Sequence, residues 1–329
     1  IGLNCKLMVV KGDGSLVSAD FAKELPVETI LSGPAASVKG AAFLANQRTG
    51  IICDIGGTTT DISILKNGEV DLSEDGAKIG GWSTMIEAVK IWTSGIGGDS
   101  ELHIGYDSPP STIKLGPRRA LPLSLLGGQF PACILIMEQQ LLAPIALATD
   151  ARFIMPLMSE RAPSWLARSE AKMAERLIKN GISAIADIAD TQVALGAIDR
   201  LISKGLAQLS CFTPTDAAHI LGSFDIYNKK AAILGAQLLA RQKDNKGQMI
   251  AKSAEALSQI CLDKLSFESA LKISDAAIAE DDGTENTAST TPAIKAALSK
   301  RTQQSRLLQH DIRLLSPIIA LGASAKTHY

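Results

Sequence analysis

The segment best suited to chemistry is residues 54–61, with the sequence Asp-Ile-Gly-Gly-Thr-Thr-Thr-Asp. It overlaps the β-branched run 51–55, so a buried strand is expected to carry Asp54 to the tip of a hairpin. Paired glycines let a backbone approach an anion without obstruction by a Cβ atom, and N–H groups and hydroxyls can then surround the anion. The segment therefore predicts a phosphate-binding loop with five ligand residues: Gly56, Gly57, Thr58, Thr59 and Thr60.

The two acidic residues that flank this loop are suited to a metal ion. Asp54 is predicted to hold a hydrated Mg²⁺, which prefers carboxylates reached partly through water, and Asp61 either shares that role or faces solvent. A simpler interpretation is that Gly56 and Gly57 only reverse the chain and the threonines only favour a strand. That interpretation leaves the flanking carboxylates without a function, so we favour phosphate and metal binding.

A second glycine-rich loop, residues 95–100, follows another β-type run. Gly97 and Gly98 would permit close approach of the backbone to phosphate or substrate. Asp99 is a candidate catalytic carboxylate for proton transfer or for a metal. An ordinary turn between a strand and a loop is the alternative, and the residues leave both open.

Two further segments have both a structural and a functional interpretation. Residues 213–216, Thr-Pro-Thr-Asp, are typical of a capped helix start, although a substrate contact by Asp216 stays open. Residues 317–321 predict a buried strand that is followed at once by small residues. Such small residues let a nucleoside lie flat against the backbone, or let a helix pack closely on a sheet. The candidate nucleotide-binding residues here are Gly322, Ala323 and Ser324.

The composition excludes several classes of protein. The 329 residues are 46% hydrophobic, 20% charged and 4% aromatic, which indicates a globular chain rather than a disordered one. A net charge of −1 and dispersed Lys and Arg residues do not favour nucleic-acid binding. The five cysteines show no CxxC spacing, and no apolar run is long enough to cross a bilayer. We therefore expect a cytoplasmic protein without nucleic-acid or membrane partners.

The order of the patterns predicts an α/β fold. Residues 32–46 are expected to form a helix capped by Ser32. The segment after it is expected to form two strands, which an Asn-Gly turn joins to a third strand in a meander. After about residue 159 the apolar spacing becomes helical. Residues 281–292 lack an apolar period and predict an exposed loop.

Several of these segments together resemble one known family. Residues 54–61 are similar to the second phosphate loop of the actin, sugar kinase and Hsp70 superfamily of ATPases. With residues 26–38, which contain Ser-Gly-Pro-Ala-Ala, the chain resembles the hydantoinase/oxoprolinase family. Further matches span most of the chain and lie at residues 11–15, 95–100, 115–118 and 213–217.

The resemblance implies an actin-like ATPase fold, of the ribonuclease H-like type, with a mixed sheet and an α-rich insertion. Residues 1–160 would form the nucleotide-binding portion, 161–305 a mostly helical insertion, and 306–329 a return strand with an adenosine-type loop. It further implies ATP and Mg²⁺ as cofactors, and ATP-dependent hydrolysis of a hydantoin- or oxoproline-type cyclic amide through phosphorylation of its carbonyl oxygen. A small-molecule kinase of the same superfamily and a non-catalytic nucleotide-binding assembly module are the alternatives.

Two departures from the family pattern change what is expected. Family members begin with another phosphate loop, and no second copy occurs here, so an N-terminal half is expected to be removed or to lie on another polypeptide. We therefore expect the chain to hydrolyse ATP poorly by itself, and to work as an oligomer or with a second catalytic subunit. Residues 116–122 also differ from the better-known hydantoinases, which indicates a shorter branch of the family and opens the choice of substrate to carbonyl compounds other than a cyclic amide.

Overall fold

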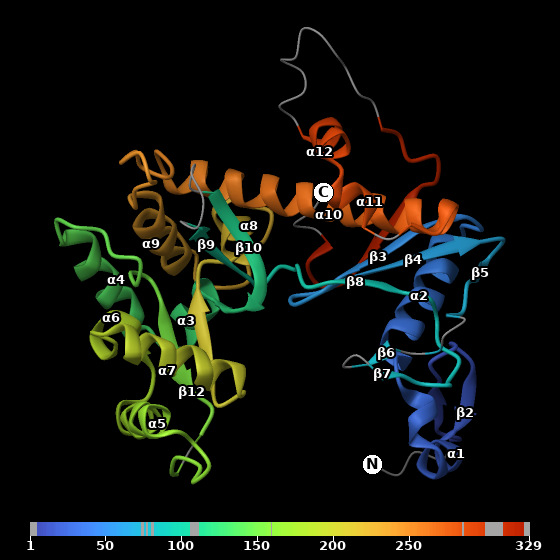
Figure 1. The fold of residues 1–329 in the computed structure, drawn as a ribbon, viewed down its shortest axis with the longest axis horizontal. Helices are drawn as coiled ribbons and strands as arrows, with labels where there is room; N and C mark the ends of the chain where they lie inside the picture. The colour runs from blue at the N-terminus through green and yellow to red at the C-terminus, as the bar shows by residue number, and fades with distance from the viewer. Residues whose placement is uncertain are drawn as a thin grey trace, which may run out of the picture. The chain divides into compact units, whose positions relative to one another are not determined.

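The computed structural model describes residues 5–73, 76, 78–79, 82–105, 112–158, 160–284, 286–299 and 312–325. Their contacts divide the chain into two compact units, one made of residues 1–94 and 267–325 and the other of residues 95–266. These bounds differ from the expected ones, which lay near residues 160 and 305. Both units mix helices with strands (Figure 1). Among the described residues, no helix is both long enough and apolar enough to span a bilayer.

The first unit is built on a mixed sheet with the strand order β15-β3-β4-β5, to which β8 adds by pairing with β4. The sheet strands are β3 (Gly50–Ile55), β4 (Thr60–Lys66), β5 (Glu69–Val70), β8 (Trp92–Ser94) and β15 (Ile318–Leu321). The other strands form two small ribbons, β1 (Met8–Val10) with β2 (Leu16–Ser18) and β6 (Lys78–Ile79) with β7 (Trp82–Ser83). The helices are α1 (Ala19–Glu24), a 3₁₀ turn (Pro26–Thr29), α2 (Ser32–Ala45), the later part of α10 (Ala254–Asp282), α11 (Thr287–Thr290) and α12 (Pro292–Leu298).

Helices cover both faces of the central strands, which explains why β3 is an almost continuous apolar run. On one face Ala35 and Val38 of α2 pack against Ile52 of β3. On the other face Ile273 of α10 packs against Cys53. The predicted meander is confirmed, because β3, β4 and β5 pair antiparallel in sequence order. The predicted return strand is present, since β15 pairs parallel with β3, but the prediction that it is buried is wrong, because Ile318 and Ala320 are exposed.

Two local predictions in this unit are wrong. Ser32 does not cap α2, because Leu31 takes the cap position with φ at 60° and Ser32 is the first helical residue. The expected loop at residues 281–292 is largely helical, since α10 continues to Asp282 and α11 and α12 begin soon after it. The polar end of α10 is stabilised by two lysines, Lys66 at the end of β4 and Lys90 just before β8, which both bind Glu280.

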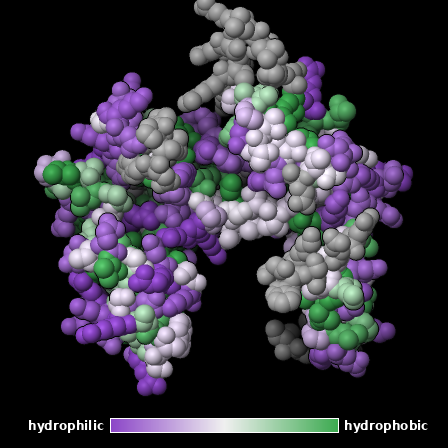
Figure 2. Space-filling model, in the orientation of Figure 1, coloured by the Kyte–Doolittle hydropathy of each residue, from purple (hydrophilic) through white to green (hydrophobic). Residues whose placement is uncertain are grey.

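Hydrophobic side chains are exposed over the first strands and helix of this unit (Figure 2). They lie on and beside β1, β2 and α1, and comprise Leu7, Met8, Leu16, Leu25 and Val27. Near the end of α2, the side chains of Phe43 and Leu44 are each 83% exposed. This part of the surface is therefore less polar than is usual for a solvated ribbon and helix.

The second unit contains a four-stranded sheet in the order β11-β14-β12-β13 and a separate hairpin of β9 and β10. Its strands are β9 (Ser100–Gly105), β10 (Thr112–Arg119), β11 (Leu121–Pro122), β12 (Phe153–Pro156), β13 (Ser183–Ala184) and β14 (Ala207–Cys211). Its helices are α3 (Leu123–Gln129), α4 (Ala132–Leu142), α5 (Arg168–Asn180), α6 (Ile185–Ile188), α7 (Gln192–Ser203), α8 (Pro214–Leu221), α9 (Lys229–Ala240) and the first part of α10. The expectation of mainly helical structure after residue 159 is confirmed.

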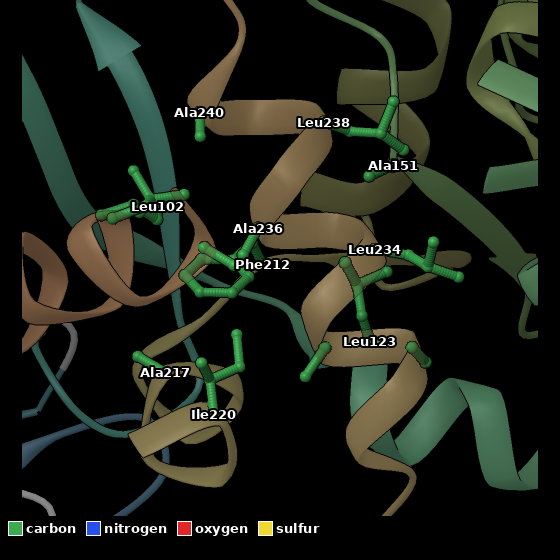
Figure 3. Close-up of a cluster of buried hydrophobic side chains, with 14 of the residues drawn as sticks. Leu102, Leu123, Ala151, Phe212, Ala217, Ile220, Leu234, Ala236, Leu238 and Ala240 are labelled. Atoms are coloured by element: carbon green, nitrogen blue, oxygen red, sulfur yellow. The ribbon is translucent and has the colours of Figure 1, made fainter. Parts of the chain in front are cut away.

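Two apolar clusters fill this unit. The larger one surrounds α9, where Leu234 and Ala236 are buried together with Leu102 of β9 and Phe212 (Figure 3). The smaller one lies between α5, α7 and the sheet, and it includes Leu177 and other side chains that are fully buried. Small alanine side chains supply much of α9, which lets neighbouring helices approach closely.

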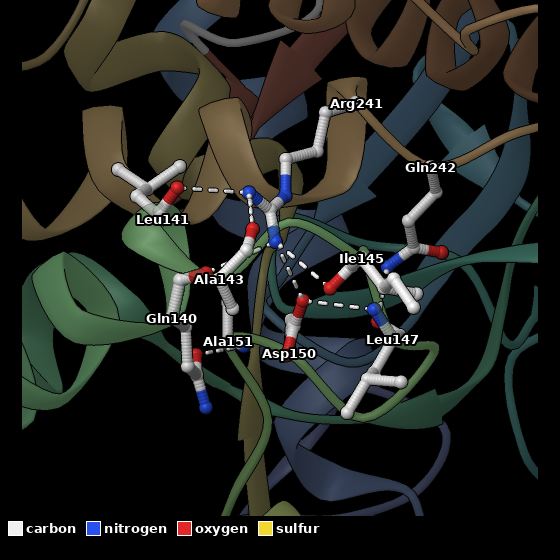
Figure 4. Close-up of polar contacts among 9 residues, drawn as sticks. All are labelled: Gln140, Leu141, Ala143, Ile145, Leu147, Asp150, Ala151, Arg241 and Gln242. Carbon is white, nitrogen blue, oxygen red and sulfur yellow. Dashed lines mark hydrogen bonds and ion pairs between the residues drawn. The ribbon is translucent and has the colours of Figure 1, made fainter.

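Arg241 fixes the irregular segment that follows α4. Its guanidinium donates to the carbonyl oxygens of Gln140, Leu141, Ala143 and Ile145, at 2.9–3.2 Å, and lies 3.5 Å from the Asp150 carboxylate (Figure 4). A guanidinium offers several donors in one plane, so a single side chain can satisfy several carbonyl groups at the end of a helix. The adjacent Gln242 adds a bond from Nε2 to the Leu147 carbonyl.

Asp216 is a structural cap for two helices. Its carboxylate accepts from the N–H groups of Leu123 and Ser124 at the start of α3, and from the Thr213 N–H and hydroxyl at the start of α8. The predicted cap at Thr213 is confirmed, because its hydroxyl accepts from the Asp216 N–H in a capping box. Burial raises the pKa of the Asp216 carboxyl, and the bonds from Ser124, Leu123 and Thr213 oppose that rise.

Replacing Asp216 with Asn is expected to destabilise the protein by about 2–3 kcal/mol, because an amide NH₂ would then face buried N–H donors. The free energy of unfolding from urea titration measures the effect. Asp225→Asn, which changes an exposed carboxylate close by in the chain, is the matched control and should leave stability unchanged. Equal stability of the two variants would contradict the capping role.

The Glu280 carboxylate should make stability depend on pH. Burial raises its pKa, but hydrogen bonds from Lys66 and Lys90 outweigh burial and lower the pKa from 4.5 to about 2. A lowered carboxyl pKa stabilises the fold above the unfolded value near 4.5, and this contribution is lost as the pH falls towards 2. Glu280→Gln should therefore lower the free energy of unfolding at pH 7 by about 1–2 kcal/mol, since the half-exposed lysines are partly screened by solvent.

The measurement is the difference in unfolding free energy between wild type and Glu280→Gln from pH 7 to pH 2, which should shrink towards zero. Asp20→Asn serves as the control, because Asp20 and Lys23 are 89% and 77% exposed and their pair should contribute almost nothing. A difference that stays constant with pH would rule out the ion pairs as its source.

Candidate functional site

The tip of the β3–β4 hairpin presents unbonded backbone amides. The hairpin is closed by the Gly56 N–H, which donates to the Thr59 carbonyl at 2.9 Å. Within the described part of the chain, the N–H groups of Gly57, Thr58 and Thr59 have no acceptor. Unpaired N–H groups at a glycine-rich turn form a partial positive charge suited to an anion. The turn thus has the donors that the sequence predicts for a phosphate loop.

Asp54 and Asp61 face each other directly across the hairpin. They are register partners on β3 and β4, and so project from the same face of the sheet as Ile52. Like charges at directly opposed positions are destabilising unless a cation or hydrogen-bond donor compensates them. No donor or cation among the described residues bonds to the Asp54 carboxylate. The pair is therefore an anionic position without a cation of its own.

In the part of the chain that the structure describes, Asp61 has one hydrogen-bond partner, the Thr93 hydroxyl on β8, which donates to Oδ1 at 2.7 Å. Burial raises the pKa of Asp61, the Thr93 bond lowers it, and the charge of Asp54 raises it again, with a net upward shift. The folded chain thus disfavours the ionised form of Asp61. Thr93 was not among the predicted site residues, because its contact arises only from the pairing of β8 with β4.

The loop that follows β15 lies beside the tip of this hairpin, next to Asp54 and Ile55. Leu321 is the register partner of Asp54, so the chain leaves the sheet beside it. A Cβ atom on Gly322 would lie 2.6 Å from the Asp54 Oδ1 and 2.4 Å from the Ile55 carbonyl oxygen, and Gly322 has φ at 98°. Only glycine tolerates both conditions. The Ser324 N–H then donates to the Ile55 carbonyl at 3.0 Å.

The structure therefore brings together two predicted segments that are far apart in the sequence. The first unit contains these predicted residues: Asp54, Gly56, Gly57, Thr58, Thr59, Thr60, Asp61, Gly322, Ala323 and Ser324. The hairpin offers amides and carboxylates, and the loop beside it offers the exposed backbone of Gly322 and Ala323, which carry no side chain or only a methyl group. Such an arrangement can accept an anion at the turn and a flat group next to it.

The donor set suits a weakly coordinated, hydrated cation. Among the described residues, no group of three or more His, Cys, Asp or Glu side chains could enclose a metal ion. Two opposed carboxylates remain, Asp54 and Asp61. Mg²⁺ usually takes one or two protein carboxylates and completes its shell with water and phosphate oxygens. The residues present thus fit Mg²⁺ bound together with a phosphate, and do not fit a closed structural metal site.

The second predicted loop belongs to the second unit, where its polar groups have internal partners. The Gly97 N–H donates to the Ser100 hydroxyl at 2.9 Å, and the Gly98 carbonyl accepts from the N–H and hydroxyl of Thr215. Asp99 accepts from Thr215 at 3.2 Å and lies 3.3 Å from Arg119. These contacts tie the loop to the start of α8, which favours the structural alternative for Gly97 and Gly98.

Comparisons with known proteins agree with the resemblance found in the sequence. A search of curated proteins found no match. One similar solved structure is nucleotide-free acetone carboxylase, whose title names ATP-dependent acetone carboxylation; it has 16% identity and a TM-score of 0.45, over 85% of this chain and 30% of that one. This chain thus spans less than a third of that relative. The family model for hydantoinase/oxoprolinase matches residues 2–226. The chain belongs to the hydantoinase/oxoprolinase family.

Proposed function

We propose that the chain is the nucleotide-binding part of an ATP-dependent enzyme with an actin-like ATPase fold. The observation that carries the proposal is the β3–β4 hairpin, where amides without an acceptor lie beside two opposed carboxylates that no cationic side chain of the described residues contacts. A hairpin that served only to reverse the chain would not require two like charges opposite each other, because such a pair costs stability. A triphosphate with its cation would supply both missing partners.

The roles of the residues follow from this arrangement. The N–H groups of Gly57, Thr58 and Thr59 would hold the β- and γ-phosphates, and Asp54 with Asp61 would hold Mg²⁺ through water. When bound, the cation neutralises charge on the phosphates, which lowers the barrier to phosphoryl transfer. Gly322, Ala323 and Ser324 would lie against the adenosine. Position 322 has to be glycine, because a side chain there would collide with Asp54.

The family suggests the substrate. We propose that the activated group is the carbonyl oxygen of a cyclic amide of hydantoin or oxoproline type, which becomes a better target for ring opening once phosphorylated. Charge neutralisation and positioning supply most of the catalysis in such a transfer. Asp99 is retained as a proposed catalytic carboxylate, since its side chain is 18% exposed and its neighbour Arg119 is more accessible.

Nucleotide binding tests the proposal directly. We expect a non-hydrolysable ATP analogue to bind the chain only with Mg²⁺, and Asp54→Asn to weaken that binding by about tenfold or more, because one cation ligand and its charge are lost. Isothermal titration calorimetry is the measurement. Glu69→Gln, on the exposed edge strand of the same sheet, is the matched control and should bind as wild type does.

Affinity that is independent of Mg²⁺, or equal in Asp54→Asn and wild type, would remove the support for this site.

The chemical step has its own assay, in which release of ADP is followed with and without hydantoin or oxoproline. The chain by itself is expected to hydrolyse ATP slowly, and the expected result is that either compound raises this low rate in wild type but not in Asp54→Asn. No stimulation of a chain that still binds Mg²⁺ and nucleotide would contradict the cyclic-amide substrate and leave the nucleotide site standing.

The opposed carboxylates predict a gain in stability when one of them is neutralised. Asp61→Asn should raise the melting temperature of the free protein at pH 7, since the raised pKa of Asp61 shows that its ionised form is disfavoured on folding. The gain should disappear as the pH falls below the ordinary aspartate pKa near 3.9, where wild type is protonated in both states. Scanning calorimetry across this range measures it, and a lower melting temperature for Asp61→Asn at pH 7 would contradict the electrostatic argument.

A further inference from the structure

Three polar side chains stand in one row across the central sheet of the first unit. The antiparallel registers pair Asp54 of β3 with Asp61 of β4, and Asp61 with Thr93 of β8. Side chains at directly paired positions project from the same face of a sheet and lie close enough to interact. Thr93 is therefore the neighbour of Asp61 on the side away from Asp54, in the same row as both carboxylates.

The Thr93 hydroxyl makes the two oxygens of Asp61 unequal. It donates to Oδ1 at 2.7 Å, a length typical of a hydroxyl bound to an ionised carboxylate. Among the described residues, no hydrogen-bond donor or cationic side chain contacts Oδ2 of Asp61 or either oxygen of Asp54. One oxygen of Asp61 is thus already engaged by the protein, and the other is available to a ligand.

The packing of β8 does not require this hydroxyl. Thr93 is exposed, whereas Trp92 and Ser94 on either side of it project from the opposite face of the sheet, where Trp92 packs against the cluster around Ile273. Valine has the same branched shape as threonine and an equal preference for strands, so it would pair with β4 just as well. Within the described residues, the Asp61 carboxylate is the polar partner of the Thr93 hydroxyl.

An Asp61 with one engaged oxygen suits some cations better than others. Ca²⁺ takes many oxygen ligands in a flexible shell and often draws on both oxygens of one carboxylate. Mg²⁺ is smaller, keeps several of its waters and is bound through only one or two carboxylates. A carboxylate oxygen that already accepts a hydrogen bond is a weaker metal ligand, since the donor shares its lone-pair density. The bond from Thr93 therefore disfavours Ca²⁺ more than it disfavours Mg²⁺.

We propose that Thr93 determines the cation specificity of the carboxylate pair Asp54 and Asp61. By holding Oδ1 of Asp61, it leaves a single free oxygen on that side chain and so selects Mg²⁺ against Ca²⁺. Thr93 acts through Asp61 as a positioning residue and does not touch the cation. The inference rests on the proposed function, because it takes the two carboxylates as the cation-binding groups of a nucleotide site.

The test compares how well each cation supports binding of a non-hydrolysable ATP analogue to the whole chain. Isothermal titration calorimetry is run with Mg²⁺ and with Ca²⁺, and the ratio of the two affinities is the readout. Thr93→Val removes the hydroxyl and keeps the branched shape, whereas Thr93→Ser keeps the hydroxyl. Thr49→Val makes the same chemical change at an exposed position just before β3 and is the matched control. The melting temperature of each variant checks that it folds.

Wild type should bind the analogue more tightly with Mg²⁺ than with Ca²⁺. Thr93→Val should reduce this preference by about fivefold, the value of one hydrogen bond, and should keep the wild-type melting temperature. Thr93→Ser and Thr49→Val should keep the wild-type preference. A purely structural role of Thr93 would change both affinities alike and leave their ratio as it is.

The outcomes separate this inference from the proposed function. If wild type binds the analogue with Mg²⁺ and Thr93→Val keeps the same ratio of affinities, the role of Thr93 is overturned and the nucleotide site stands. The role is equally overturned if Thr93→Ser loses the preference as Thr93→Val does, or if wild type prefers Ca²⁺. If neither cation promotes binding to wild type, the proposed function fails, and the inference fails with it.

Discussion

Strand β3 is paired along both edges, with β4 on one side and β15 on the other, and this pairing fixes the surroundings of Asp54. The antiparallel register places Asp61 opposite its carboxylate, and the parallel register brings the chain out of the sheet at Gly322. Neither neighbour can move by one residue without turning the apolar side chains of β3 away from the helices that cover them. The same burial that stabilises the sheet therefore holds two like charges together.

The second unit handles buried charge in a different way. Glu101, Asp150 and Asp216 each have a partner, either a guanidinium or a set of backbone N–H groups. These bonds stabilise irregular segments and helix starts that apolar packing alone would leave undefined. Three buried polar atoms of this unit, the His103 Nδ1, the Ser124 Oγ and the Arg241 Nε, have no hydrogen-bond partner among the described residues.

Local patterns could be predicted from the sequence where neighbouring residues determine the structure. The glycine pair between two β-type runs predicts the hairpin, and Thr213 with Pro214 and Asp216 predicts the start of α8. Contacts between distant segments were harder to predict. Thr93 binds Asp61 only through sheet pairing. The end of α10 is held by Lys66 and Lys90, which bind Glu280 from a distant part of the sequence, and no periodicity of residues 281–292 could show these contacts. The roles of the site residues stay predictions.

The parallel pairing of β15 with β3 also has a consequence for synthesis. Residues near the start of the chain emerge from the ribosome long before residues 318–324, so the hairpin spends most of translation with one edge of β3 uncovered and without the Gly322 loop. Exposed strand edges invite pairing with other chains, and contacts between such distant segments form slowly. A nascent chain would thus acquire the complete surroundings of Asp54 only at a late step, after the rest of the sheet has formed.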